Sequence, residues 1–199
     1  MNPLYTNMEG EIAVRLARAK VELVVARAPM PHIQLTPRFS EKSGAFVTLD
    51  TYPGHELRGC IGYPEPYFPL REALLRAAEG VVEDPRFPPL RKEELDHIVV
   101  EVSILTPPEL IQAPNDELPR HIQIGRDGLI VERGGFRGLL LPQVAVEYNW
   151  APEEFLEHTC MKASLPPDAW RLPGTKFYRF GAEVFGEKEP RGKVERREH

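Results

Sequence analysis

The sequence predicts a domain that contains both helices and strands, and three observations support this expectation. Apolar residues recur at helical spacing between residues 12 and 23. Residues 98–105 alternate between apolar and polar side chains, as in a strand with one buried face. Short apolar runs between residues 122 and 141 are separated by glycine-containing turns, which is typical of a β meander.

The first predicted element is a helix that begins at a capping box, Thr6-Asn7-Met8-Glu9, and ends near Pro29. Two i,i+4 ion pairs, Glu11/Arg15 and Arg18/Glu22, are expected on its exposed side. Its apolar stripe is expected to lie in the core. That stripe consists of Ile12, Leu16, Ala19 and Leu23.

Two strands and a second helix are predicted next. A loop over residues 29–43 leads to the strand Gly44–Asp50, and a turn at residues 52–55 leads to the stretch Leu57–Tyr63. Pro69 opens the helix, which ends before Asp84-Pro85 because a residue before proline avoids the α conformation. One face of this helix is apolar: Leu70, Leu74, Ala77 and Val81.

The rest of the chain is expected to add five strands and one helix. A proline-stiffened loop and a helical turn over Lys92–Asp96 precede the strand Ile98–Leu105, on which Glu101 and Ser103 face away from the apolar side. Residues 109–120 are expected to be irregular. The later strands are Ile122–Ile124, Leu129–Arg133, Phe136–Leu141 and Lys176–Phe185, and a helix is expected over Glu153–Ala163.

The stretch Leu57-Arg58-Gly59-Cys60-Ile61-Gly62-Tyr63 is the most unusual of these elements. In an extended chain Arg58, Cys60 and Gly62 share one face. Gly59 and Gly62 pack no side chain, so they indicate a bulge or a close approach by another backbone or a ligand. Leu57-Arg58-Gly59 also matches Phe136-Arg137-Gly138 at an offset of 79 residues. This match suggests a duplicated strand–strand–helix–strand unit, in which case both halves should contribute equivalent strands to one sheet.

Composition limits the classes of function. With 42% hydrophobic and 28% charged residues among 199, the chain is expected to form one globular domain, or a large lobe with a smaller one. The net charge of −5, with acidic and basic residues interleaved, argues against nucleic-acid binding. No apolar run is long enough to span a membrane and no secretory signal is evident, so a cytoplasmic protein is expected.

Several smaller features carry expectations of their own. The tail from Lys188 to Arg197 is expected to be a solvated, partly frayed terminus. Cys60 and Cys160 are too few for a disulfide framework, although they could pair. The 21 prolines and many charged residues suit a thermophile. Six scattered histidines and the absence of nucleotide-binding motifs predict no metal and no cofactor.

Several motifs together resemble the AMME-syndrome critical-region (AMMECR-like) domain family, of the archaeal single-domain type. They are LRGCIG, DPRFPP (84–89), VEVSILTPPEL (100–110), GRDGLIVE (125–132), GLLLPQV (138–144), PPDAW and TKFYRF. The resemblance covers nearly the whole chain. It implies an α+β fold with a largely antiparallel, curved and barrel-like sheet flanked by helices, and a cleft at LRGCIG. The family has no settled activity, and some bacterial genomes place it beside Memo-like and radical-SAM-like proteins, which hints at a redox or modification pathway.

Chemistry at the motif has two interpretations. Cys60 is a candidate nucleophile whose pKa Arg58 would lower, or it is a small buried hydrophobic side chain. Asp84 and Arg86 either pair locally or bind substrate, and Glu101, if its face is buried, should pair with Arg58 or Arg86. Further candidate binding groups are Gly59, Gly62, Ser103 and Gln143, the glycines through their backbone amides.

Two functions therefore remain open. One is an enzyme acting on an unknown small molecule, or modifying another molecule, at an LRGCIG cleft. The other is a domain without catalytic activity in which LRGCIG is structural and a surface groove binds a protein partner. A reachable Cys60 in a concave, arginine-lined pocket would favour the enzyme, whereas a fully covered one would favour the binding domain.

Overall fold

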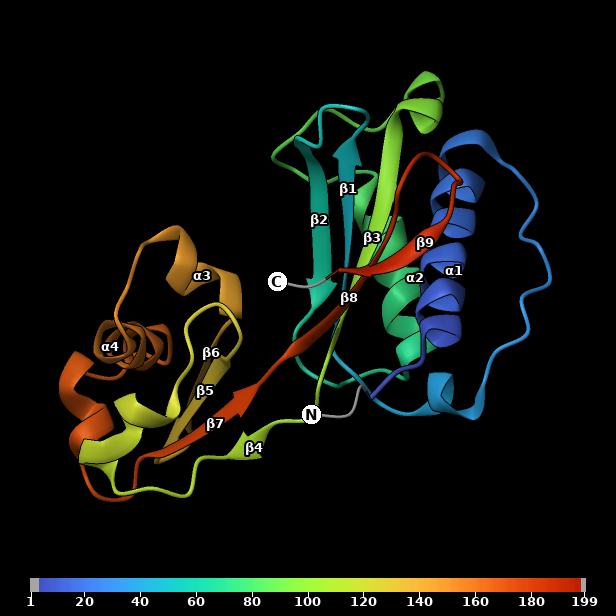
Figure 1. Ribbon diagram of the computed structural model, residues 1–199. Coiled ribbons are helices and arrows are strands. Elements are labelled where there is room, and N and C mark those ends of the chain that lie inside the picture. Colours follow the sequence, from blue (N-terminus) through green and yellow to red (C-terminus); the bar gives the residue numbers. More distant parts are fainter. Residues whose placement is uncertain (1–3, 198–199) are drawn as a thin grey trace. The chain divides into compact units, whose positions relative to one another are not determined.

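A computed structural model of the protein describes residues 4–197, which divide into two compact units, each with its own hydrophobic core. The first unit comprises residues 4–105 and 183–197, and the second comprises residues 106–182. Each unit combines helices with one open sheet (Figure 1). No helix within residues 4–197 is both long enough and apolar enough to cross a membrane.

The first unit is a five-stranded sheet with two helices on one face (Figure 1). Its strand order is β2-β1-β3-β8-β9, and β1 runs antiparallel to both of its neighbours. The helices α1 and α2 pack against each other and against the apolar side chains of the sheet. The elements are α1 (Asn7–Ala26), β1 (Ala45–Thr51), β2 (Leu57–Tyr63), α2 (Leu70–Val81), β3 (Ile98–Leu105), β8 (Ala182–Glu187) and β9 (Val194–Arg197).

The second unit contains a four-stranded sheet with the order β4-β7-β5-β6. Helix α4 packs on β5 and β6 and buries Phe155 and Leu156 in the core of this unit. The elements are β4 (Glu109–Leu110), β5 (Gly128–Arg133), β6 (Phe136–Leu140), α3 (Pro142–Glu147), α4 (Pro152–Lys162) and β7 (Lys176–Phe180). Short 3-10 helices lie at Pro37–Ser40, Lys92–His97, Asn115–His121 and Pro167–Arg171.

Most elements of the first unit were predicted. The capping box is present, since the Thr6 hydroxyl accepts from the backbone of Glu9 and the Glu9 carboxylate accepts from the backbone of Thr6. The apolar face predicted for α2 is fully buried. The alternation predicted for 98–105 is also observed, because Val100, Val102 and Ile104 are buried while Glu101 and Ser103 are half-buried.

The exposed side of α1 differs from the prediction at Arg18. Glu11 and Arg15 pair as expected, but Arg18 is 4% exposed and pairs with the buried Glu187 of β8 rather than with Glu22. Arg18 also donates to the backbone oxygens of Leu95 and Ile98. Buried charges persist when they are paired and hydrogen-bonded, so this arginine links α1 to the sheet. Pairing with a residue 169 positions away leaves no local sequence signal.

The α+β fold with antiparallel sheets and flanking helices is observed, but the barrel-like curvature is not confirmed, because neither of the two sheets within residues 4–197 is closed. The reason is local. The predicted strand Lys176–Phe185 is broken at Gly181, so that β7 belongs to one sheet and β8 to the other. The matching motifs of the two halves consequently lie in different sheets, contrary to the expectation of a shared one.

Two further predictions are corrected by the structure, and the pairing of the two cysteines, which the sequence left open, is not observed. The tail forms strand β9, which pairs with β8, instead of fraying. Residues 122–124 are not a strand, and Pro142 opens the short helix α3, which the prediction lacked. Cys60 and Cys160 are free thiols, and Cys160 is fully buried in the core of the second unit.

Candidate functional site

The LRGCIG stretch forms β2, an edge strand that pairs only with β1. The register shifts between Leu49, which pairs with Gly59, and Asp50, which pairs with Leu57. Arg58 is therefore the extra residue of a β-bulge, one of the two arrangements that the glycines indicated. A bulge interrupts the strict alternation of side chains between the two faces of the strand. Arg58 therefore does not share a face with Cys60.

The outer edge of β2 is covered by the loop that follows α2. The backbone N–H of Cys60 donates to Asp84 Oδ2 at 2.9 Å, and the backbone oxygen of Cys60 accepts from Arg86 at 3.1 Å. Asp84 and Arg86 are joined to each other by two side-chain hydrogen bonds, of 2.7 and 3.0 Å. We call these three residues the edge clamp. It satisfies backbone groups that an edge strand otherwise offers to another chain.

Electrostatics stabilise the edge clamp. The Asp84 side chain is 1% exposed, yet hydrogen bonds from Arg86 hold the pKa of its carboxyl well below the usual range, despite the opposing effect of burial. The same pairing raises the pKa of Arg86. The local pairing predicted for these two residues is thus observed.

Arg58 is bound away from the thiol. Its Nε lies 2.7 Å from Glu94 Oε1, and its guanidinium also donates to the backbone oxygen of Pro88 at 2.9 Å. The ring centroid of Phe87 lies 5.9 Å from the guanidinium carbon of Arg58 and 5.6 Å from that of Arg86. Arg58 and Arg86 are therefore both held by contacts with this loop or with Glu94. The hydrogen bond from Arg58 also lowers the pKa of Glu94.

The Cys60 thiol lies in a half-buried position on the face of β2 that also carries Gly62. The Thr48 hydroxyl donates to Cys60 Sγ at 3.3 Å. Burial raises the pKa of the thiol, and the opposing effects of Thr48 and Arg86 do not reverse that shift. This differs from the expectation that Arg58 lowers the pKa of Cys60. At neutral pH the thiol is protonated.

A row of polar side chains crosses the sheet from Cys60. Thr48 pairs with Cys60 on one side and with Glu101 on the other, so the three side chains lie next to one another on the face opposite α1 and α2. Glu101 Oε2 lies 3.9 Å from Nε of Arg197 on β9. Gly186, between them on β8, leaves room for both side chains. We call Cys60, Thr48, Glu101 and Arg197 the polar row.

The two glycines of the motif are explained by packing. A Cβ atom at Gly59 would lie 3.0 Å from the backbone oxygen of Val81, at the end of α2. One at Gly62 would lie 2.4 Å from the ring of Phe46, far closer than real contacts allow. Packing within the protein therefore accounts for both glycines: Gly62 leaves no space for a Cβ atom, and Gly59 leaves little.

The structure divides the sequence-predicted site residues into three groups. Cys60, Glu101 and Ser103 share the face of the polar row, since Ser103 lies two residues from Glu101 on β3. Arg58, Asp84 and Arg86 lie along the edge of β2. Gln143 is exposed on α3 of the second unit.

Sequence reasoning missed three residues, Thr48, Glu94 and Arg197. Glu101 was expected to pair with Arg58 or Arg86 if its face were buried; it is half-buried, and Arg197 lies 3.9 Å from it. The alternation of residues 45–51 offered a signal for Thr48. No local signal existed for the other two, because Glu94 reaches Arg58 across 36 residues and Arg197 was assigned to a frayed tail.

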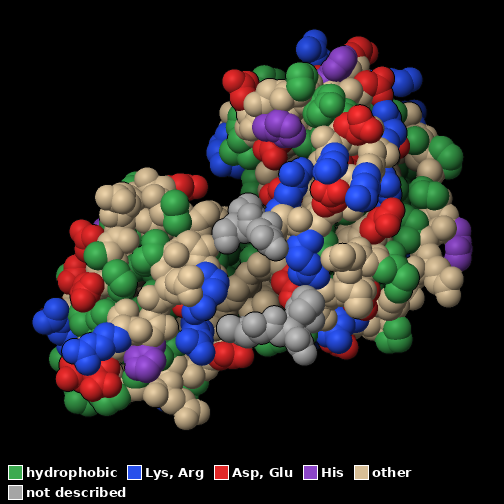
Figure 2. Space-filling model, viewed as in Figure 1, with side chains coloured by type: hydrophobic (Ala, Val, Ile, Leu, Met, Phe, Trp, Pro, Cys, Tyr) green, Lys and Arg blue, Asp and Glu red, His purple; other side chains and the backbone are tan. Residues whose placement is uncertain are grey.

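Neither the face drawn in Figure 2 nor the metal-ligating side chains of residues 4–197 mark a ligand site near the two motifs. On the face in view, acidic and basic side chains are interspersed (Figure 2). Within residues 4–197, no three His, Cys, Asp or Glu side chains gather in a way that could hold a metal ion. The His158 ring instead stacks on Trp150, with ring centroids 3.9 Å apart.

Comparison with known proteins assigns the family. The AMMECR1 family model matches residues 14–185, most of the chain. The chain belongs to the AMMECR1 family. The sequence resemblance is thereby confirmed, and the edge clamp and the polar row are features of an AMMECR1 domain.

Relatives cover almost all of this AMMECR1 domain. A protein of Thermococcus gammatolerans is 57% identical over 94% of this chain and 95% of its own length. One of Methanocaldococcus jannaschii is 57% identical over 96% of each chain. The crystal structure of an uncharacterized protein from Pyrococcus horikoshii matches with a TM-score of 0.77, at 52% identity and over 98% of both chains. The relatives are themselves uncharacterised, so they assign the family without assigning a reaction.

Proposed function

We propose that this chain is a binding domain for a protein partner. The face of the polar row is the recognition surface, and LRGCIG with DPRFPP forms its rigid edge. One observation carries this proposal: each charged group of the two motifs is engaged by an ion pair with a partner on the protein itself. Asp84 is occupied by the Cys60 amide and by Arg86, and Arg58 is occupied by Glu94.

A catalytic site normally keeps a charged or reactive group available to its substrate. At this motif the charged groups are paired instead of available. The Asp84–Arg86 pair holds the backbone of Cys60 from the outer side of β2. The protonated thiol and the neighbouring Thr48 hydroxyl then serve as small polar contacts on the sheet face opposite α1 and α2. Polar side chains of this kind contribute hydrogen bonds at protein–protein interfaces.

A second candidate function is an enzyme with Cys60 as its nucleophile. The observation in its favour is the hydrogen bond from Thr48 to Cys60 Sγ, which favours the thiolate and gives the thiol a polar environment on a half-buried face. In this alternative, Glu101 and Ser103 on the same face bind or orient the substrate. The two candidate functions require different pKa values for the Cys60 thiol.

The experiment is the pH dependence of iodoacetamide alkylation at Cys60 in the folded protein, with the modified site quantified by peptide mass spectrometry. The binding domain requires a pKa at or above that of an ordinary thiol, about 8.5. It also requires that Arg58→Gln leave this pKa unchanged, because Arg58 is bound to Glu94. Arg76→Gln, which removes an exposed ion pair on α2, is the matched control.

A lowered pKa of the Cys60 thiol would decide against the binding domain. A thiol that titrates well below the ordinary value, with a pKa that rises in Arg58→Gln but not in Arg76→Gln, would overturn the binding-domain proposal and establish an activated nucleophile. Circular dichroism of each variant ensures that alkylation is measured on folded protein.

A further inference from the structure

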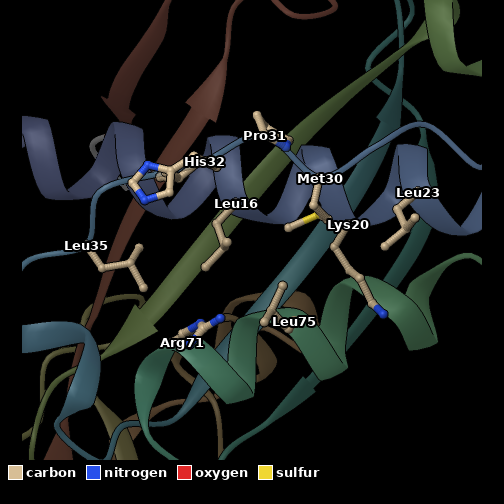
Figure 3. Close-up of a pocket in the computed structure, with 10 residues that line it drawn as sticks. Leu16, Lys20, Leu23, Met30, Pro31, His32, Leu35, Arg71 and Leu75 are labelled. Atoms are coloured by element: carbon tan, nitrogen blue, oxygen red, sulfur yellow. The ribbon is translucent and has the colours of Figure 1, made fainter.

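The first unit contains a pocket on the side of the sheet away from the polar row. It lies between α1, α2 and the loop that follows α1, as Figure 3 shows. Its volume is about 490 Å³, within the range of small-molecule sites. The lining residues are Leu16, Lys20, Leu23, Met30, Pro31, His32, Ile33, Leu35, Arg71 and Leu75.

The interior of the pocket is apolar. Leu16 and Leu23 come from α1, Leu75 comes from α2, and Ile33 and Leu35 come from the loop. Leu16 is buried and the other four are half-buried, so together they form an extended hydrophobic groove. Burial of this surface against a ligand that carries a hydrocarbon chain would be favourable by roughly 25 cal/mol for each Å² removed from water.

The polar groups of the pocket are cationic or basic. Lys20 from α1 and Arg71 from α2 both line the cavity, and His32 lies at its rim, whereas none of the lining residues is acidic. Within residues 4–197 Arg71 has no ion-pair partner. Lys20 pairs at 2.9 Å with Glu79, whose side chain is 62% exposed. Such a surface pair contributes at most about 1 kcal/mol, so an anion in the pocket can compete for this lysine.

We propose that this pocket binds an elongated apolar molecule with a single anionic head group, a carboxylate or a phosphate. The head group lies at Arg71, which has no ion-pair partner within residues 4–197, and the hydrocarbon part lies along the leucines. A neutral or cationic molecule of the same length would fill the apolar groove but would not pair with the cationic side chains of the pocket. The site is separate from the polar row, because its lining includes no residue of β1, β2 or β3.

The test uses dodecanoate below its critical micelle concentration as the probe and the Met30 methyl group as a local reporter. Met30 lines the pocket, whereas Met8 and Met161 are exposed outside it, at 62% and 53%. In protein labelled with ¹³C at the methionine methyls, dodecanoate should shift the Met30 signal saturably and leave Met8 and Met161 unchanged. Dodecyl phosphate in place of dodecanoate distinguishes a phosphate from a carboxylate head group, according to which binds more tightly.

Two variants test the cations. Arg71→Gln should weaken dodecanoate binding about tenfold, since a charge-assisted contact contributes about 1.5 kcal/mol. Lys20→Gln should weaken it less, because Lys20 already pairs with Glu79. Arg76→Gln should not weaken it, because Arg76 lies on the same helix but pairs with Glu72 outside the pocket. Dodecyltrimethylammonium should bind at least tenfold more weakly than dodecanoate.

Three results would each overturn the proposal. One is a Met30 signal that does not move, and another is equal affinity for the anionic and cationic probes. The third is dodecanoate binding that Arg71→Gln leaves unchanged. Circular dichroism confirms the fold of each variant, and all the substituted residues are at least partly exposed, so loss of folding does not obscure the result.

Discussion

A single carboxylate determines how the LRGCIG edge is held. Asp84 accepts hydrogen bonds from the backbone N–H groups of Cys60 and Arg86, at 2.9 and 3.0 Å, and from the guanidinium of Arg86. Its side chain is buried, and a neutral group would bind these donors less strongly. The ionised form of Asp84 is therefore favoured in the folded protein.

This arrangement predicts a pH-dependent stability that Asp84→Asn should lose. The folded-state pKa of Asp84 is lowered below the unfolded value of about 3.9. Its contribution is therefore fully present above about pH 4 and declines as the pH falls toward the folded-state pKa. Urea unfolding should show Asp84→Asn about 2 kcal/mol less stable than the wild type at pH 7, with a smaller difference at pH 3.

Asp116→Asn is the control for general acid effects, because Asp116 is exposed in the 3-10 helix Asn115–His121. This variant should have the stability of the wild type at both pH values. A difference between the wild type and Asp84→Asn that stays constant from pH 7 to pH 3 would mean that the charge of Asp84 contributes nothing to the edge clamp.

At the scale of elements, the two units repeat one arrangement. In the first unit β1 pairs with β2 and β3, and α2 connects β2 to β3 along the chain. In the second unit β5 pairs in the same way with β6 and β7, and α4 lies between these strands in the chain. The glycines match as well. Gly59 packs against the end of α2 at Val81, and Gly138 packs against the end of α4 at Ala163.

If these glycines have the same packing role, alanine at either position should be destabilising. A Cβ at Gly138 would lie 2.5 Å from the backbone nitrogen of Ala163, so Gly138→Ala should cost about 2–3 kcal/mol. At Gly59 the nearest atom is 3.0 Å away, and about 1 kcal/mol is expected. Chemical denaturation measures the change in the free energy of unfolding for each variant.

Gly181→Ala is the matched control, since its Cβ would meet ordinary contacts of 3.7 Å or more. Its stability should stay within about 1 kcal/mol of the wild type. Equal effects of all three substitutions would refute a special role for the two glycines that follow arginine.

The elements also indicate what the sequence can predict. Periodicity and capping located α1, α2, β1 and β3, because local patterns determine these elements. The break at Gly181 was not predictable, since Gly181 is hydrogen-bonded to Thr106, 75 residues away. The β8–β9 hairpin is local, but the many charged residues of the tail indicated a solvated end instead. In the candidate site, too, contacts between residues close in the chain could be predicted and distant ones could not. The pair Asp84–Arg86 is local and was predicted, whereas Arg58 binds Glu94 across 36 residues.

At the scale of the whole molecule, residues 4–197 have two cores, where the sequence left open one domain or a large lobe with a smaller one. The larger cluster includes Phe39, Val102 and Phe185, and the smaller one includes Phe155 and Trp170. Each cluster is formed within one unit, and within residues 4–197 the chain passes between the units near residues 105 and 182. Separate cores are the usual basis for separate cooperative unfolding.

Both tryptophans of the chain, Trp150 and Trp170, lie in the second unit, so tryptophan fluorescence reports on that unit alone. Val102→Ala opens a cavity in the first core, where Val102 is fully buried, and should cost about 2 kcal/mol. In urea, far-ultraviolet circular dichroism should then show an earlier transition while the fluorescence midpoint stays at its wild-type value. Phe155→Leu should have the converse effect, because Phe155 is fully buried in the second core. If either substitution moves both signals together, the two cores unfold as one cooperative unit and their separation is structural only.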